Sequence, residues 1–202
     1  MNPDIYLASQ SAGRKLLMEE AQIPFTTISQ SADEHECDWN QSLQDVVLSI
    51  ARYKMEYAVI PAATDNKHCI VITADTLVQS PQGNICGKPE SIEHAKKMLQ
   101  ELQGSLLVAS AFCARSFEWD GAQWKQVAAH EECVTSTMEL YMTDAEIKDY
   151  ISKIDVLKIA GALHVEGYGS QFIKSVEGSY TAIIGLPMFE LRKALQQLGF
   201  VS

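Results

Sequence analysis

The stretch CIVITADTLVQ, residues 69–79, decides the predicted fold. Its first part, Cys69 to Thr73, is an unbroken apolar and β-branched run, which predicts a strand that is buried on both faces of a sheet. Asp75 follows this run, so we expect its carboxylate at the carboxyl end of the strand. Because open α/β sheets bind ligands in the crevice beyond that end, the stretch predicts an α/β fold with a carboxylate at a cleft.

Extended and helical patterns alternate on both sides of this strand. Apolar and β-branched runs predict strands at residues 5–9, 24–30, 106–119 and 124–141, while helical spacing predicts helices at 11–22, 42–58, 91–104, from Thr143 and from Pro187. Ser11, Ser91 and a Thr143–Glu146 capping box mark helix starts. Asp120-Gly121 is a hairpin signal between the two longest strands, and the glycine-punctuated segment 160–187 is predicted to return to strand character.

Composition restricts the possible functions of this 202-residue chain. Its hydrophobic content of 47% is that of a folded protein with a sizeable core. The net charge of −10 and the pI near 4.9 argue against a nucleic-acid partner. We find neither a signal-peptide pattern nor an apolar run of about 18 residues, which predicts a cytoplasmic protein with no membrane partner. The five cysteines form no CxxC pair, as expected in a reducing compartment.

Several polar side chains have catalytic potential, although most have a simpler explanation when taken alone. The strand-to-helix turn from Ser9 to Arg14 suits a phosphate, because a helix N-terminus offers free N–H groups and a positive dipole end. A capped helix with exposed cations is the commoner case. The acidic stretch around Glu34 is typical of a solvated loop, and Lys54 of a helix surface. Lys88 differs, because its glycine and proline neighbours limit the entropy that it loses on meeting a phosphate.

Four motifs acquire meaning from their order. The chain carries Ser-x-Ser-x-x-Arg at residues 9–14, Ala-Asp-Thr at 74–76, Gly-Lys-Pro at 87–89, and a glycine-rich segment at 160–187 that ends in Gly-Leu-Pro. In this order they resemble the motifs of the Maf-like nucleoside triphosphate pyrophosphatases over nearly the whole chain. The resemblance implies a single domain over residues 1–202, with an elongated α/β fold in which helices flank a mixed central sheet and two lobes surround a central cleft.

The resemblance also implies an activity and its requirements. Members of the family hydrolyse nucleoside triphosphates between the α and β phosphates, with Mg²⁺ or Mn²⁺ as cofactor, and are frequently homodimers. This chain is therefore expected to be a hydrolase of nucleotide metabolism that removes modified or surplus triphosphates. The alternative from a different class is a weakly catalytic, nucleotide-binding regulator of cell division.

The family's site residues transfer onto matching positions of this chain. The resemblance implies catalytic roles for Asp75, Glu34, Lys54 and Lys88, and substrate binding by Ser9, Ser11, Arg14, Thr76 and Glu166. Glu34 and Asp75 are expected to hold the divalent metal, since hard cations prefer carboxylate oxygens. Asp75 is also the expected base for the attacking water, and its two roles are not separated by the sequence.

Departures from the family pattern bear on the base and on turnover. Gly13 replaces an arginine that many members carry, which is the feature that favours the regulator. Glu166 stands where many members that act on thymidine or uridine triphosphates have Gln. A carboxylate only accepts hydrogen bonds, which matches the paired donors of guanine and the positive charge of 7-methylguanine. Thr76 instead resembles the thymidine and uridine type, so the expected substrate is 7-methyl-GTP or, alternatively, dTTP and UTP.

Overall fold

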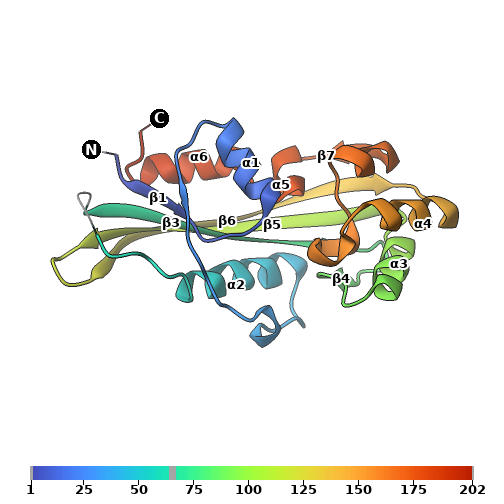
Figure 1. The fold of residues 1–202 in the computed structure, drawn as a ribbon, viewed down its shortest axis with the longest axis horizontal. Helices are drawn as coiled ribbons and strands as arrows, with labels where there is room; N and C mark the ends of the chain where they lie inside the picture. Colours follow the sequence, from blue (N-terminus) through green and yellow to red (C-terminus); the bar gives the residue numbers. More distant parts are fainter. Residues whose placement is uncertain (1, 64–66, 202) are drawn as a thin grey trace.

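A mixed sheet of seven strands runs along the length of the elongated molecule (Figure 1). The computed structural model describes residues 2–63 and 67–201. The sheet order is β2-β1-β3-β5-β6-β7, and β4 pairs with β3 off this path. Pairing is parallel for β1 with β2 and with β3, and antiparallel elsewhere. The strands are β1 (Asp4–Leu7), β2 (Thr26–Thr27), β3 (His68–Gln79), β4 (Ile85–Cys86), β5 (Gly104–Trp119), β6 (Trp124–Leu140) and β7 (Ile173–Glu177).

Helices flank this sheet, and their starts agree with the capping signals of the sequence. The α-helices are α1 (Ala12–Glu20), α2 (Leu43–Glu56), α3 (Ile92–Glu101), α4 (Asp144–Lys153), α5 (Tyr180–Ile184) and α6 (Met188–Gln197). Short 3₁₀ helices are η1 (Glu34–Glu36), η2 (Val156–Lys158), η3 (Ala160–Ala162) and η4 (Gly167–Phe172). Ser11 and Ser91 cap α1 and α3, and the Thr143–Glu146 capping box starts α4. The predicted α/β class is confirmed.

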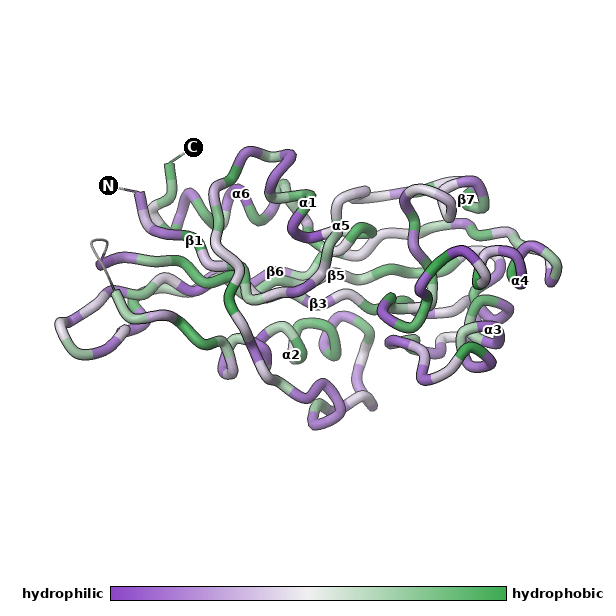
Figure 2. The backbone as a smooth tube through the Cα atoms, viewed as in Figure 1, coloured by the Kyte–Doolittle hydropathy of each residue, from purple (hydrophilic) through white to green (hydrophobic). Residues whose placement is uncertain are grey.

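The two faces of β3 bury different helices. Alternate side chains such as Ile70 and Ile72 pack with α1 and α6, whereas Val71 and Leu77 face the side covered by α2. Figure 1 shows α2 on one side of the sheet and α1, α5 and α6 on the other. In Figure 2 the first part of β3 and much of β5 are coloured as hydrophobic. Burial on both faces explains why the sequence of β3 is a continuous apolar run.

A second core lies at the other end of the long strands. There α3, α4 and the 3₁₀ segments pack around side chains of β3, β5 and β6, among them Val78, Val108 and Met138. The two ends of the molecule thus form two lobes that share β3, β5 and β6 (Figure 1). No helix of the described ranges combines the length and the apolar composition needed to cross a bilayer.

One expectation about the central strand is wrong: Asp75 does not lie at its carboxyl end. β3 continues to Gln79, because antiparallel pairing with β5 extends over all of its residues. On the opposite edge the partner β1 ends where Leu7 pairs with Ile72, and β4 joins only at Val78. The edge of β3 between these two partners has no neighbouring strand in the described sheet, and Asp75 lies within this open edge.

The predicted strand character of residues 160–187 is also largely wrong. Only Ile173–Glu177 forms a strand, and η3, η4 and α5 occupy most of the remainder. Gly161 and Gly167 have positive φ values of 65° and 56°, a conformation that breaks an extended chain into tight turns. The last helix begins at Met188, with Pro187 as its N-cap residue rather than its first helical residue.

Candidate active site

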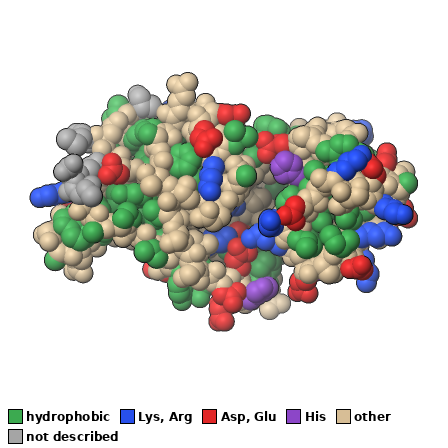
Figure 3. All heavy atoms as spheres, in the orientation of Figure 1, with side chains coloured by type: hydrophobic (Ala, Val, Ile, Leu, Met, Phe, Trp, Pro, Cys, Tyr) green, Lys and Arg blue, Asp and Glu red, His purple; other side chains and the backbone are tan. Residues whose placement is uncertain are grey.

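A cleft of about 650 Å³ opens at the unpaired edge of β3, between the two lobes. It is lined by segments far apart in the sequence: the β1–α1 loop, Glu34, Lys54, the middle of β3, Lys88, and residues of η2, η3, the following loop and α5. Figure 3 shows acidic and basic side chains gathered in a hollow near the middle of the visible face. One half of the cleft is charged and the other is apolar, so it suits a ligand with the same division.

The charged half contains two carboxylates joined by a buried lysine. Lys54 Nζ lies 2.6 Å from Asp75 Oδ1 and 2.7 Å from Glu34 Oε1. Lys54 projects from the last turn of α2, and only 5% of its surface is exposed. It was expected on a helix surface if it had no function, and its burial contradicts that explanation. A buried ammonium is stable only when it is paired, so the two carboxylates and Lys54 form one electrostatic unit.

The two carboxylates of this unit differ in their acidity. Burial raises the pKa of the Asp75 carboxyl, and the Lys54 ammonium only partly opposes that rise. Burial acts in the same direction on Glu34, but Lys54, Lys88 and Arg14 outweigh it and hold the pKa of Glu34 below its usual value. A carboxylate with a raised pKa is a stronger base, so the environment makes Asp75 the more basic of the two carboxylates.

One oxygen of the Asp75 carboxylate is left for a ligand. Asp75 Oδ2 is buried and has no hydrogen-bond partner among the described residues. A buried carboxylate oxygen without a partner is costly, and a divalent cation would satisfy it. Residues 2–63 and 67–201 contain no cluster of three or more His, Cys, Asp or Glu side chains suited to a metal ion. Mg²⁺, however, is commonly held by one or two carboxylates with substrate phosphates, and Asp75 with Glu34 fits that donor set.

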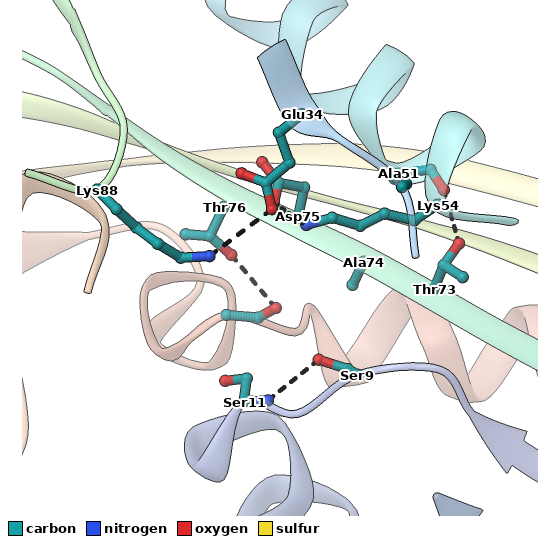
Figure 4. A network of polar contacts seen from close by, with 12 residues as sticks. Ser9, Ser11, Glu34, Ala51, Lys54, Thr73, Ala74, Asp75, Thr76 and Lys88 are labelled. Carbon is teal, nitrogen blue, oxygen red and sulfur yellow. Dashed lines mark hydrogen bonds and ion pairs between the residues drawn. The ribbon is translucent and has the colours of Figure 1, made fainter. Parts of the chain in front are cut away.

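Ser9 and Ser11 lie across the cleft from these carboxylates and offer hydroxyl groups. Ser9 Oγ accepts hydrogen bonds from Ser11 N at 3.3 Å and from Arg14 Nη1 at 3.2 Å. Ser11 Oγ caps α1 by accepting from the Arg14 backbone N–H. Because both oxygens accept these bonds, the proton of each hydroxyl remains to be donated. Figure 4 shows both serines on the loop that faces the Glu34 and Asp75 side of the site. This wall suits a phosphate oxygen.

Arg14 is buried beneath this wall and holds mostly protein oxygens. Its Nε donates to Gly185 O at 2.8 Å, its Nη1 to Ala74 O at 2.8 Å, and its Nη2 to the Thr76 hydroxyl at 3.0 Å. With the Nη1 bond to Ser9, four of its five N–H donors are used. The fifth has no acceptor in the part of the chain that the structure describes. Arg14 therefore combines a structural role with one donor and a positive charge at the cleft.

Lys88 and Glu34 are brought together by Trp39, which the sequence analysis did not single out. Lys88 Nζ lies 3.7 Å from Glu34 Oε1, and Figure 4 shows Lys88 and Lys54 approaching Glu34 from opposite sides. The Trp39 indole N–H donates to Glu34 O at 3.1 Å, and its ring would lie 3.3 Å from a Cβ at Gly87. The sequence does contain a signal for Trp39, because a large aromatic side chain is unexpected in a polar loop that is only solvated.

The apolar half of the cleft lies next to Glu166. Its walls include Val78, Val108, Met138, Leu163, Val165 and Ile183. The Glu166 side chain is about one quarter exposed (26%), and its Oε2 lies 3.8 Å from His164 Nε2. His164 Nδ1 faces the Glu166 carbonyl oxygen at 3.1 Å and must carry the proton there, because a carbonyl only accepts. His164 is a cleft residue that the sequence analysis missed.

Gly13 lets α1 lie close to the end of α5. A Cβ at this position would lie 3.1 Å from Ile184 Cγ2, 3.3 Å from Ile184 O and 3.7 Å from Glu166 Oε2. A side chain there meets the apolar half of the cleft and its carboxylate. A larger residue at position 13 would therefore change the cleft next to Glu166, whereas the cluster of Lys54, Asp75 and Glu34 does not involve Gly13.

The structure brings all nine predicted site residues to one cleft. Each lines its wall: Ser9, Ser11, Arg14, Glu34, Lys54, Asp75, Thr76, Lys88 and Glu166. Thr76 differs from the others in that its hydroxyl is engaged with protein atoms, Arg14 Nη2 at 3.0 Å and Ser110 Oγ at 2.7 Å. Its predicted contact with substrate therefore has to compete with these bonds.

Known proteins have sequences that are similar to this chain over nearly its whole length. The model of a family described as Maf-like protein matches residues 4–198. A protein of Caldicellulosiruptor bescii named dTTP/UTP pyrophosphatase is 32% identical over 197 residues, covering 97% of this chain and 95% of its own. Proteins of the same name from Bacillus cereus (strain G9842) and Hydrogenovibrio crunogenus are 34% and 30% identical, covering 96% and 100% of this chain and 94% and 100% of their own.

Proposed function

The chain belongs to the Maf-like protein family, as its motifs predicted, and we propose that it is a nucleoside triphosphate pyrophosphatase. The reaction is hydrolysis of the α–β phosphoanhydride to a nucleoside monophosphate and pyrophosphate. The observation that carries this proposal is the buried cluster of Lys54 with Asp75 and Glu34. Across the cleft from this cluster lie hydrogen-bond donors that suit a phosphate, and the other half of the cleft is apolar. Because the cleft is lined by residues from Ala8 to Ile184, we further propose that the chain works as one domain.

The charged half of the cleft accounts for the binding of the triphosphate. The hydroxyl protons of Ser9 and Ser11 and the N-terminus of α1 bind phosphate oxygens. Lys88 is about half exposed (55%), so its ammonium is free to move from Glu34 to a phosphate. Pro89 restricts the backbone of Lys88, which lowers the entropy lost in that movement.

Asp75 performs the proton transfer in this proposal. Burial raises the pKa of its carboxyl above the usual value, so it accepts a proton from the water that attacks phosphorus. Lys54, held 2.6 Å from Asp75, fixes the carboxylate and, with Arg14 and Lys88, stabilises the charge that develops on the phosphoryl oxygens. Asp75 and Glu34 are the residues that would hold Mg²⁺ or Mn²⁺. When bound, such a cation supplies Lewis-acid polarisation of a phosphoryl oxygen.

The base is proposed from the relatives and from the apolar half of the cleft. The similar proteins are named dTTP/UTP pyrophosphatases, so dTTP and UTP are the first proposed substrates. A specific observation favours 7-methyl-GTP as the second: the Glu166 carboxylate lines the cleft next to its apolar half. A carboxylate accepts the two adjacent donors of guanine and attracts the cationic methylated ring.

A pyrophosphate-release assay tests both parts of the proposal. We expect release with Mg²⁺ or Mn²⁺ from at least one of dTTP, UTP and 7-methyl-GTP, and loss of release in Asp75→Asn, which keeps the shape of the side chain but not its basicity. Asp149→Asn is a matched control, since Asp149 pairs with Lys153 on α4 and neither residue lines the cleft. Tight nucleotide binding without turnover by the unaltered protein would instead support the regulator.

A further inference from the structure

A buried serine on β5, Ser110, hydrogen-bonds the Thr76 hydroxyl, which in turn accepts a hydrogen bond from Arg14. Ser110 is fully buried, with 0% of its surface exposed, and it does not line the cleft. Its hydroxyl lies 2.7 Å from the Thr76 hydroxyl and 2.5 Å from Ala182 O. It thus connects the middle of β3 with helix α5. Thr76 of β3 is 34 residues from Ser110 in the sequence, and Ala182 of α5 is 72 residues from it.

The donors in this cluster follow from counting protons. Arginine only donates, so Thr76 Oγ1 accepts from Arg14 Nη2. A carbonyl only accepts, so the single proton of the Ser110 hydroxyl goes to Ala182 O. Ser110 must then accept from Thr76. The chain of donors therefore runs one way, from Arg14 through Thr76 and Ser110 to the carbonyl of Ala182.

Both ends of this chain are anchored in the same short segment. Ala182 O lies in the last turn of α5, where helix carbonyls lack intrahelical donors: Gly185 N and Leu186 N both donate to Thr181 O. Ser110 therefore donates a hydrogen bond to a helix carbonyl that receives none from within the helix. At the other end Arg14 Nε donates to Gly185 O. Gly185 has a φ of 132°, and a Cβ there would lie 3.4 Å from both Arg14 Nε and Thr76 Oγ1.

We propose that Ser110 is a positioning residue that holds the Arg14 guanidinium at the cleft through the Thr76 hydroxyl. The role rests on the proposed pyrophosphatase activity, in which Arg14 presents its one remaining donor to the triphosphate. Without the Ser110 hydroxyl, the Thr76 proton turns to Gly185 O, which lies 3.4 Å away and already accepts from Arg14 Nε. This rotation of the hydroxyl turns a lone pair of Thr76 Oγ1 away from Arg14 Nη2, so the guanidinium is held less firmly.

A double-mutant cycle tests the connection between Ser110 and Arg14. Ser110→Ala should lower kcat/KM for pyrophosphate release by about fivefold, the loss typical of one hydrogen bond, and Thr76→Val by at least as much. Thr76→Ser keeps the hydroxyl and should restore most of the activity. In an Arg14→Lys background, which lacks the planar guanidinium, Ser110→Ala should have no further effect. Ser116→Ala is the control, because Ser116 is an equally buried hydroxyl on the same strand that bonds His68 instead.

The outcomes separate this inference from the proposed function. Equal losses from Ser110→Ala in the wild-type and Arg14→Lys backgrounds would overturn the positioning role, because they would show that Ser110 acts without Arg14. If the unaltered protein releases no pyrophosphate, the proposed function fails, and the chain of donors is then judged by urea unfolding. Non-additive losses of unfolding free energy for Ser110→Ala and Thr76→Val support the chain, and additive losses refute it.

Discussion

Replacing Lys54 by methionine isolates the charge that joins the two carboxylates. Methionine is about as long as lysine and apolar, so it fills the same space beneath the cleft without the ammonium. In Lys54→Met the carboxylates of Asp75 and Glu34 lose partners at 2.6 Å and 2.7 Å. Asp75 is the more affected of the two. Only 5% of its surface is exposed, and its second oxygen, Oδ2, has no hydrogen-bond partner among the described residues.

The size of the effect follows from the geometry. At an effective dielectric constant of about 20, a pair of charges at the Lys54–Asp75 distance attracts by roughly 6 kcal/mol before desolvation is subtracted. Removing one partner of such a buried pair costs about 3–5 kcal/mol of unfolding free energy. Without Lys54 the folded-state pKa of Asp75 rises further, so the folded state binds more protons than the unfolded state. The stability of Lys54→Met therefore falls as the pH rises from about 4 to 8.

Urea unfolding between pH 4 and pH 8, in EDTA to exclude divalent cations, measures this dependence. We expect the deficit of Lys54→Met to be largest at pH 8 and smallest near pH 4. The double variant Lys54→Met/Asp75→Asn removes the orphaned negative charge and should recover part of the loss at pH 8. A deficit that does not change with pH, or no recovery in the double variant, would show that Lys54 stabilises the protein by packing rather than by charge.

Three further predictions concern other parts of the molecule. The pKa of Asp120 is lowered to about 2 by hydrogen bonds from the backbone of Gln123, from Lys125 and from Ala122. Urea unfolding at pH 7 should therefore show Asp120→Ala to be less stable than the wild type. This difference in stability should shrink as the pH falls from about 4 to 2. Gly169→Ala would place a Cβ 1.7 Å from His164 O, and it should lose about 2–3 kcal/mol and most activity; Gly167→Ala, with no atom within 4 Å of its Cβ, should lose less stability. Glu166→Gln should lower the ratio of kcat/KM for 7-methyl-GTP to that for UTP, and an unchanged ratio in the release assay would place Glu166 outside base recognition.

Local signals in the sequence predicted the elements well, because caps and turns act over a few residues. Ser11, Ser91 and Thr143 cap the helices that they were expected to cap. Asp120-Gly121 lies at the turn between β5 and β6, where Gly121 has a φ of 102°. The same locality explains the error at residues 160–187. Apolar residues between glycines suggested strands, whereas positive φ values at several of those glycines turn the chain into 3₁₀ segments.

The nine residues that the structure brings to one cleft were named from the sequence, but the interactions between them were not. Nothing in the helical pattern of α2 distinguishes Lys54 from a surface lysine, because its partners Asp75 and Glu34 are 21 and 20 residues away and meet it only in the folded chain. Ser110 gave no signal at all, since one serine in an apolar strand is unremarkable without knowledge of what lies opposite. Cytoplasmic location, metal dependence and homodimer formation stay predictions.

The open edge of β3 explains how one strand serves both lobes. Side chains alternate between the faces of a strand, so Asp75 points to the α2 side and meets Lys54, while Thr76 points to the α1 and α5 side and meets Arg14. Ala74 contributes its carbonyl, which accepts from Arg14 Nη1 because no neighbouring strand in the described sheet competes for it. In the proposed mechanism, three successive residues thus supply a base, a positioning hydroxyl and a backbone acceptor.

This arrangement needs both a β1 that stops early and a β5 that does not. If β1 extended along β3 to Asp75, it would pair the Ala74 carbonyl and cover the cleft; if β5 were shorter, the edge would lose the ladder that keeps it straight. A shift of one residue in the register of β3 would exchange the two faces, turning Thr76 toward Lys54 and Asp75 toward Arg14. The continuous apolar run that precedes Asp75 prevents that shift only in part, since it is apolar on both faces. The polar pairs of Asp75 with Lys54 and of Thr76 with Ser110, which are satisfied in one register alone, supply the rest.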